Sequence, residues 1–278
     1  MTRILGEDPV RLAAAGLNLE RLRAIERDVE AQLELPPGPR LDAHVHLGRD
    51  ADGHELSPDG LIADLDRFAV DTAVAFPAND PGSDGTFTVP NTMVLDAARQ
   101  TPDRIIPFVR LDPATAHEGS LVEWHARGAR GLKLHPVAQH TRPEGPETVA
   151  LVSAAGELGI PVLIHAGFGA RPLAEPLLAL TAQCPRTDLI LAHGGRGDAR
   201  ALRDAFIGNP RVAFDTSLAT IADLVELPPD QLVFGSDRPY GDLLSNLVLV
   251  AGAARHAGWT EGEFAGVLGG NLVRFFSR

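Results

Sequence analysis

Pro161-Val-Leu-Ile-His165 is a short apolar run that ends in a histidine. Leu189-Ile-Leu-Ala-His193 repeats this arrangement further along the chain. Apolar runs that are continuous, rather than alternating with polar residues, are typical of parallel strands covered by helices on both faces. The two stretches therefore predict buried parallel strands, each with a histidine at its carboxyl end.

The same pattern extends outward in both directions, because short β-like runs alternate with helix-like runs from residue 41 onward. The predicted strands are 41–46, 72–76, 104–109, 131–135, 161–165, 189–193, 212–215 and 232–237. The predicted helices are 57–68, 91–100, 119–127, 147–158, 172–184, 198–207, 219–227 and 243–257. Eight strands that are each followed by a helix predict an α/β protein, a (β/α)8 TIM barrel. A doubly wound open sheet is the alternative, but no glycine-rich phosphate-binding loop follows the first strand.

A helical pattern of leucines and other apolar residues also precedes the first strand, over residues 8–34. Pro36-Pro-Gly-Pro39 then ends it. We therefore divide the chain into a helical N-terminal extension, 1–40, and a barrel domain, 41–278. The extension is expected to plug the bottom of the barrel or to pack on a neighbouring subunit. Residues 260–276 predict a closing helix, and Thr260 with Glu263 is typical of a capping box.

The composition limits the class of protein. Of the 278 residues, 44% are hydrophobic and 22% are charged, as in ordinary globular proteins. No apolar run approaches the ~18 residues of a membrane-spanning helix. The single cysteine, Cys184, cannot form an internal disulfide, which favours a reducing, cytoplasmic location. A net charge of −12 argues against nucleic acid or an anionic membrane as partner. A small-molecule substrate is expected, and a homo-oligomer is possible.

Residues that bind metals stand at the carboxyl ends of several predicted strands: His44, His46, His165, His193 and Asp237. In a barrel these ends converge on one mouth, where active sites lie. Residues at i and i+2 of a strand face the same way, so the first two histidines both point inward. Any one of these histidines alone would more often be a hydrogen-bonded rim residue. Together, the imidazoles and the carboxylate predict a site for a divalent metal, with Zn²⁺ first and Mn²⁺, Fe²⁺ or Ni²⁺ as alternatives.

The joint pattern resembles the amidohydrolase superfamily, in its amidohydrolase-related branch, from about residue 41 to the C-terminus. The matching segments are Leu41-Asp-Ala-His-Val-His-Leu-Gly48, Gly131-Leu-Lys-Leu-His-Pro136, Leu163-Ile-His-Ala-Gly167, Leu191-Ala-His-Gly-Gly195, Phe234-Gly-Ser-Asp-Arg-Pro239 and Gly270-Asn-Leu-Val-Arg-Phe275. The resemblance implies that His44, His46, His165 and Asp237 are metal ligands. It also implies that His193 polarises the substrate or helps to activate water. Asp237 would in addition accept the proton of that water.

Lys133 lies on the fourth predicted strand and faces the barrel interior. In two-metal members of the superfamily a lysine there is carboxylated by CO₂ and bridges the metals. The alternative is a lysine that pairs with an acid such as Asp237, or fills the space of a second metal with its own charge. We favour one metal per chain and an unmodified Lys133; two metals are possible if the lysine is carboxylated.

Three further residues are candidates for substrate binding at the mouth: His135, Arg110 and Arg238. The arginines could hold a carboxylate or a phosphate. The alternatives are a rim histidine and salt bridges to neighbouring acids. The turn-rich loop 80–85, after the second strand, is a candidate lid.

These features predict a metal-dependent hydrolase that cleaves an amide, ester or lactone bond of a small molecule through activated water. The alternative is a metal-dependent, non-oxidative decarboxylase of a small carboxylic acid, since the same branch contains such enzymes. A phosphoesterase or nuclease is disfavoured, because those relatives commonly carry Glu where this chain has Lys133. A barrel that has lost catalysis is disfavoured by the intact set of metal-competent residues.

Overall fold

The computed structural model describes residues 4, 9–80, 86–167 and 172–277. Within them, nine strands form one curled sheet in the order β2-β1-β3-β4-β5-β6-β7-β8-β9. Neighbours pair in parallel, except that β2 runs antiparallel to β1. The strands are β1 (Leu41–Arg49), β2 (Glu55–Leu56), β3 (Thr72–Pro77), β4 (Ile105–Arg110), β5 (Gly131–Leu134), β6 (Val162–Ile164), β7 (Leu189–Leu191), β8 (Val212–Asp215) and β9 (Leu232–Val233). The predicted TIM-barrel fold is confirmed.

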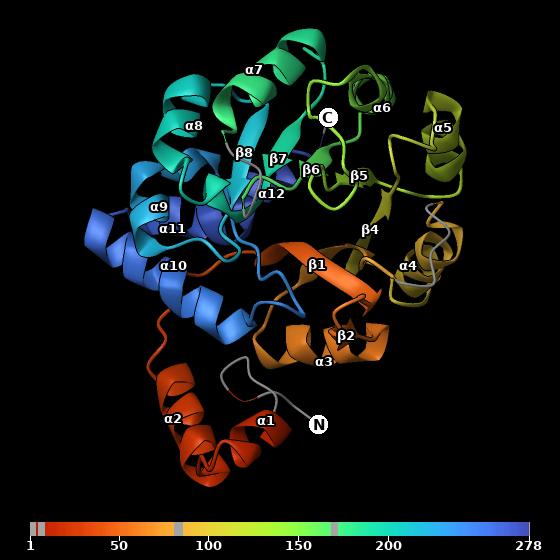
Figure 1. Ribbon diagram of the computed structural model, residues 1–278. Coiled ribbons are helices and arrows are strands. Elements are labelled where there is room, and N and C mark those ends of the chain that lie inside the picture. Colours follow the sequence, from red (N-terminus) through yellow and green to blue (C-terminus); the bar gives the residue numbers. More distant parts are fainter. Residues whose placement is uncertain (1–3, 5–8, 81–85, 168–171, 278) are drawn as a thin grey trace.

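Helices cover the outside of the sheet (Figure 1). They are α3 (Pro58–Arg67), α4 (Thr88–Gln100), α5 (Glu118–Ala126), α6 (Pro146–Leu158), α7 (Ala174–Gln183), α8 (Ala199–Phe206), α9 (Ile221–Glu226) and α10 (Leu243–Ala257). Short 3₁₀ segments, η1 (Ala192–Gly195) and η2 (Pro229–Gln231), follow β7 and precede β9. All eight predicted helices are present, with ends that differ by a few residues.

The barrel closes between its last and first strands, although β9 is only two residues long. Beyond β9 the chain continues beside β1 without regular strand geometry. There the backbone N–H of Asp237 donates to the carbonyl of His44 (2.8 Å), and the N–H of His46 donates to the carbonyl of Arg238 (2.7 Å). These bonds form a seam that joins the two ends of the barrel and places Asp237 beside the histidines of β1.

Residues near the end of the chain fill the bottom of the barrel, and no described residue of the N-terminal extension belongs to the cluster there, so the predicted plug is not seen in the described part of the extension. Leu272 and Phe275 pack into the cluster inside the barrel, against residues such as Phe108 and Ile190. The predicted closing helix is interrupted: α11 (Glu261–Ala265) leads into a π-helical turn, η3 (Gly266–Gly270), and then α12 (Asn271–Val273). The predicted Thr260–Glu263 capping box is present at its start.

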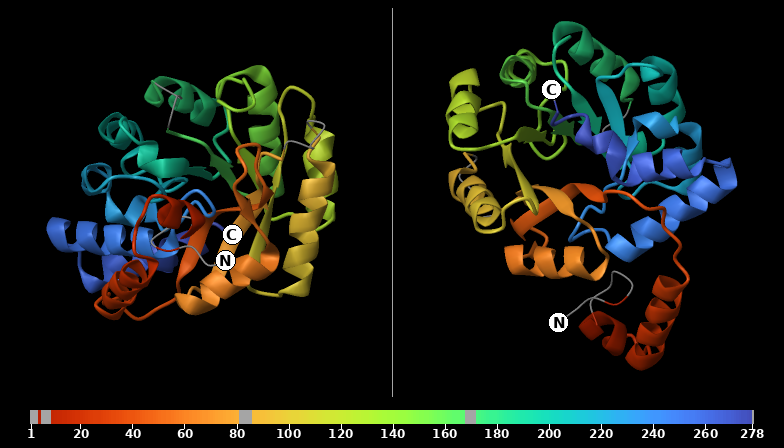
Figure 2. Two further views of the ribbon diagram at one scale, coloured as in Figure 1. Left: turned by 60° about the horizontal axis from the view of Figure 1, so that its bottom comes forward. Right: turned by 180° about the vertical axis from the view of Figure 1, so that it is seen from behind.

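The extension forms two helices, α1 (Pro9–Ala14) and α2 (Leu19–Ala31), rather than one. Gly16 separates them in a left-handed conformation (φ +76°), which a residue without a side chain adopts freely. The pair lies at one edge of the molecule, outside the ring of helices (Figure 2). Arg67, at the end of α3, holds it through Glu30 (2.8 Å) and Glu26 (3.4 Å).

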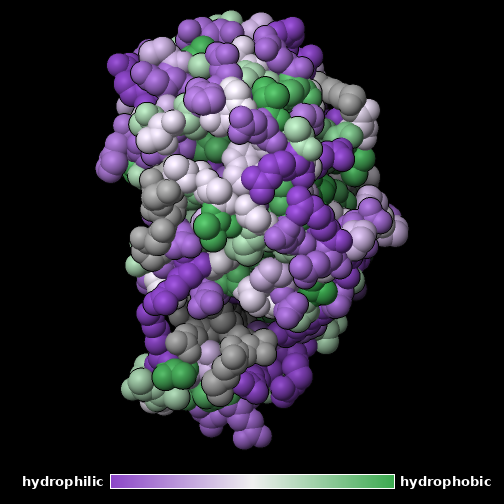
Figure 3. Space-filling view, turned by 90° about the vertical axis from the view of Figure 1, so that its right-hand side faces the viewer, coloured by the Kyte–Doolittle hydropathy of each residue, from purple (hydrophilic) through white to green (hydrophobic). Residues whose placement is uncertain are grey.

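The face drawn in Figure 3 is mainly hydrophilic, with apolar side chains scattered over it. Among the described residues, no helix has the length and apolar character needed to cross a bilayer. The loop predicted as a lid falls on residues 81–85, which lie outside the described part of the chain.

Candidate metal centre

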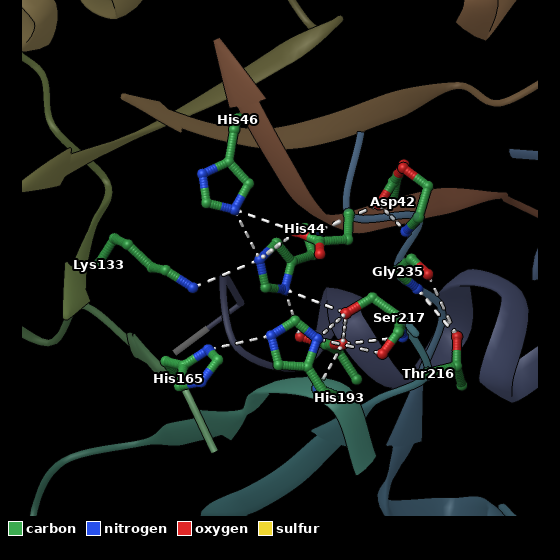
Figure 4. Close-up of polar contacts among 12 residues, drawn as sticks. Asp42, His44, His46, Lys133, His165, His193, Thr216, Ser217 and Gly235 are labelled. Carbon is green, nitrogen blue, oxygen red and sulfur yellow. Dashed lines mark hydrogen bonds and ion pairs between the residues drawn. The ribbon is translucent and has the colours of Figure 1, made fainter. Parts of the chain in front are cut away.

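All the predicted site residues except Arg238 line one cavity of about 320 Å³ at the carboxyl ends of the strands. His44 and His46 come from β1 and Lys133 from β5. The other members follow strands directly: His165 after β6, His193 in η1 and Asp237 after β9. Figure 4 shows the histidines and the lysine pointing toward a common centre. The inward orientation predicted for β1 is confirmed, because Val45, between its two histidines, packs in the core on the helix side.

Three ligand atoms meet closely in this cavity. His44 Nε2 lies 3.1 Å from His46 Nε2 and 3.0 Å from Asp237 Oδ1, and His46 Nε2 lies 3.1 Å from the same oxygen. Two ligands of one Zn²⁺ ion, each ~2.0–2.2 Å from it, are separated by roughly 3 to 3.5 Å. The three atoms therefore have the spacing of ligands on one face of a transition-metal ion.

Hydrogen bonds at the far side of His44 fix which of its nitrogens faces the cavity as an acceptor. Its Nδ1 lies 2.7 Å from Asp215 Oδ2, and both side chains are fully buried. A carboxylate accepts, so Nδ1 carries the proton and Nε2 presents a lone pair toward His46 and Asp237. This carboxylate–histidine arrangement is the one that orients imidazole ligands in metal sites.

Asp237 provides the clearest sign that a cation belongs here. Its Oδ1 is buried and, within the described part of the chain, accepts no hydrogen bond of good geometry, although two imidazole nitrogens lie within 3.1 Å. A buried acceptor without a donor is costly. A divalent metal at this point would satisfy the oxygen and both nitrogens together, so the residues present fit the metal that the sequence predicts.

His165 and His193 form a second group. The Nδ1 atom of His193 lies 3.2 Å from the carbonyl oxygen of Ser217, and His165 Nε2 lies 3.1 Å from that of Gly167. Both contacts require a proton on those nitrogens. The other nitrogens, His193 Nε2 and His165 Nδ1, face each other as acceptors at 3.1 Å. His165 thus pairs with His193 rather than with the triad of His44, His46 and Asp237, and its place among the metal ligands stays a prediction.

Burial and the charges of neighbouring groups shift the pKa values of the cluster in different directions. Burial lowers the pKa of His46 to about 3 and that of His193 to about 4, so both are neutral at pH 7. Burial also lowers the pKa of His44, but Asp215 and Asp237 outweigh it and raise the pKa overall. Although burial opposes ionisation, His44 holds the pKa of Asp237 well below its usual range. Two carboxylates around His44 thus favour positive charge at this point.

Lys133 lies inside the cavity, as predicted, with 1% of its surface exposed. Its Nζ is 3.4 Å from His44 Nε2 and 4.7 Å from the ring centre of Phe76. Burial lowers the pKa of Lys133 to about 7. The amine therefore occupies space beside the triad, within reach of the same nitrogen that faces Asp237.

The three candidates for substrate binding are placed differently. His135 and Arg110 line the cavity. Arg238 does not: its guanidinium turns away and binds Asp64 of α3, with Nε at 2.9 Å from Oδ2. The substrate-binding role predicted for Arg238 is therefore wrong. Arg238 instead forms a salt bridge, as the alternative predicted, although its partner Asp64 is distant in sequence.

Sequence reasoning missed several residues of the site. Asp215 orients His44 and also accepts the backbone N–H of His193 (3.1 Å). Ser217 donates its hydroxyl to Asp215 and lies 3.0 Å from His193 Nδ1. Tyr240 lines the cavity beside His46. A signal for Asp215 was present, because it ends a predicted strand just as the histidines do.

A family model described as amidohydrolase matches residues 41–278, which is the predicted barrel domain. No curated protein matches the chain. Several solved structures are similar to the chain. One is a probable 2-pyrone-4,6-dicarboxylic acid hydrolase from Acinetobacter baumannii with citric acid bound, at 19% identity and a TM-score of 0.62, and the match covers 86% of this chain and 99% of that one. A 5-carboxyvanillate decarboxylase from Sphingomonas paucimobilis is similar at 17% identity (TM-score 0.62, 86% and 99%). A 2,6-dihydroxybenzoate decarboxylase from Rhizobium is similar at 16% (TM-score 0.64, 86% and 99%). At these identities the likeness shows the shared barrel fold.

Proposed function

The chain belongs to the amidohydrolase family, and from that premise we propose that it is a metal-dependent hydrolase of a small amide, ester or lactone. The observation that carries this proposal is the triad of His44, His46 and Asp237, whose ligand atoms lie 3.0–3.1 Å apart around a buried oxygen with no donor. We further propose Zn²⁺ as the metal, one per chain, because imidazole and carboxylate ligands suit it.

When bound, the metal would supply Lewis-acid activation of water and of the substrate carbonyl. The chain's own residues have to manage the protons. Asp237 is an ionised carboxylate in the triad, so it could accept the proton that a water activated there would lose and return it to the leaving group. His193 is neutral. Its Nδ1 carries the proton that faces the carbonyl of Ser217, so its Nε2, which faces His165, is an acceptor. This tautomer favours a role in holding metal or water over a role as hydrogen-bond donor to the substrate.

The test is hydrolysis in ¹⁸O-labelled water by zinc-loaded protein, screened against small esters, lactones and amides. We expect one ¹⁸O atom in the acid product, loss of turnover on chelation, and recovery with Zn²⁺. Asp237→Asn should lower turnover by ~10²-fold or more, because it removes the proton acceptor. Asp59→Asn, at an exposed position of α3, is the matched control and should leave turnover unchanged.

A decarboxylase is the second candidate, because two of the structurally similar proteins carry that activity in their names. The same experiment separates the two reactions. Decarboxylation releases CO₂ from a substrate acid and places no ¹⁸O in the product. Metal-dependent CO₂ release without ¹⁸O incorporation would replace the hydrolase proposal with this alternative.

A further inference from the structure

Arg110 is a buried cation that lines the candidate metal centre and forms no close ion pair with any described residue. It ends β4, lines the cavity and exposes 1% of its surface. Its Nε and Nη2 atoms are buried and have no hydrogen-bond partner. Arginine is rarely fully buried unless it is paired. Within the described residues, Asp50 and Asp112 act on the guanidinium through their charges, but no carboxylate forms a close ion pair with it.

The acids near Arg110 are engaged elsewhere. Asp50 accepts the backbone N–H of Asn79 at 2.8 Å and the hydroxyl of Tyr240. Asp112 accepts the backbone N–H of Ala114 at 3.0 Å. The remaining neighbour is apolar, since the ring of Phe87 lies 5.0 Å from the guanidinium carbon. Burial lowers the pKa of Arg110 to about 10, which still leaves it charged at neutral pH.

Hydrogen bonds hold the backbone of Arg110 in place, and this fixes the position from which its side chain extends into the cavity. Asn91 of α4 binds it on both sides: the amide Nδ2 donates to the carbonyl of Arg110 (2.9 Å), and Oδ1 accepts its N–H (2.8 Å). Asn91 is itself fully buried. A charge that is desolvated, unpaired and pre-positioned is costly to the free protein and favourable to an anion that enters.

His135 adds an uncharged donor on the adjoining wall. The N–H of Ala138 donates to its Nδ1 at 3.2 Å, so in the neutral ring Nε2 carries the proton. The ring stacks on His165 at 3.9 Å between centres. In the register of the sheet, Arg110 of β4 stands opposite Lys133 of β5, and His135 lies two residues beyond Lys133. The cavity that holds the triad thus also offers a neutral N–H donor from His135 and the guanidinium of Arg110.

We propose that Arg110 is a substrate-specificity residue that binds a carboxylate of the substrate, separate from the bond that is cleaved. The substrate is then a small acid with its anionic group on Arg110 and its reactive carbonyl at the metal centre. A cavity of about 320 Å³ restricts it to a compact molecule. The reactive carbonyl in this inference rests on the proposed hydrolase function. The carboxylate rests on Arg110 alone.

The first experiment measures binding of glutarate, a compact dicarboxylate without a hydrolysable bond, by calorimetry. We expect binding to wild type, and a loss of roughly tenfold or more in Arg110→Gln. Arg110→Lys should be intermediate, because it keeps the charge but not the planar fork. Arg49→Gln removes an exposed arginine at the end of β1 and should bind glutarate like wild type. Dimethyl glutarate, which is neutral, is measured on chelated protein because it carries ester bonds, and it should not discriminate between wild type and Arg110→Gln.

The second experiment measures thermal stability without ligand. Replacing a buried, unpaired charge by an apolar side chain of similar length removes its desolvation cost. Arg110→Met should therefore raise the melting temperature of the free protein while abolishing the shift that glutarate causes. A residue with a merely structural role would behave in the opposite way, and its loss would lower the melting temperature.

Both measurements are repeated after chelation, so that failure of this inference is distinguishable from failure of the proposed function. Glutarate binding that survives chelation and is lost in Arg110→Gln supports the anion site even if no hydrolysis is found. Equal binding by wild type and Arg110→Gln, or no binding by wild type, overturns the inference even if hydrolysis is found.

Discussion

Lys133 is the only lysine among 25 basic residues, and it lies inside the cavity beside His44. Arginine cannot take its place in chemistry that needs a neutral amine or a carbamate. At this position the sequence leaves two states open, a carboxylated bridge between two metals or an unmodified side chain. The contact between His165 and His193, whose facing nitrogens are 3.1 Å apart, does not by itself decide between these two states.

We predict one metal per chain and an unmodified Lys133, because its amine occupies the space beside the triad. Elemental analysis should give one metal in wild type and in Lys133→Met. Protein equilibrated with ¹³CO₂ should show no side-chain carbamate signal by NMR, and a single lysine makes the spectrum unambiguous. Two metals in wild type, fewer in Lys133→Met, and a carbamate signal would together contradict this prediction.

Most individual site residues could be predicted because each ends a recognisable strand run. His44, His46 and Asp237 were found in this way, and the structure brings them together. The fates of Arg110 and Arg238 could not be separated in advance. Each follows or ends a strand and has acids nearby in sequence. Only the folded chain brings Asp64 of α3 to one of them and leaves the other without an ion pair among the described residues.

At the scale of elements, strand and helix ranges could be predicted from apolar periodicity, whereas local breaks could not. The predicted strand 232–237 shrinks to Leu232–Val233, because the chain leaves regular geometry to bring Asp237 to β1. His193 likewise lies in a left-handed turn (φ +62°) and not on β7. At both places a ligand-type side chain is aimed into the cavity by backbone that a propensity argument does not foresee.

The π-helical turn η3 gives a prediction at this scale. A Cβ on Gly269 would lie 2.2 Å from the carbonyl oxygen of Pro39, just before β1. Gly269→Ala should therefore destabilise the protein by ~1–3 kcal/mol, because the closing segment would have to move away from the start of the barrel. Urea unfolding measures this change.

Gly262 in α11 provides the matched control, since a Cβ there meets nothing within 4 Å. Gly262→Ala should be neutral or stabilise the protein by up to ~1 kcal/mol through reduced freedom of the unfolded chain. Similar losses in both variants would show that helix geometry, and not the contact with Pro39, decides the outcome.

At the scale of the whole molecule, the candidate metal centre lies across the seam where the barrel closes. His44 and His46 come from the first strand and Asp237 from the segment after the last, so all the intervening strands must be in place before the three can meet. Contacts between such distant parts of the chain form late in folding, because closing a long loop is slow. The metal should therefore bind after the folding transition state.

We predict that metal slows unfolding and leaves refolding unchanged. At a free metal concentration of 100 times Kd, binding stabilises the native state by ~2.7 kcal/mol, which corresponds to a ~100-fold slower unfolding rate if the transition state binds no metal. Stopped-flow unfolding and refolding, with Zn²⁺ and with chelator, measure both rates. A faster refolding rate with metal, at constant unfolding rate, would place closure of the seam before the transition state.

The seam also has a consequence for how the protein is made. A ribosome releases the imidazoles of β1 early, while the carboxylate that completes the triad emerges only after every strand of the barrel. A nascent or prematurely terminated chain therefore holds only half of the candidate metal site. If the proposed metal binds there, its occupancy reports that synthesis reached the end of the barrel, and an interrupted product would lack both the metal and the proposed activity.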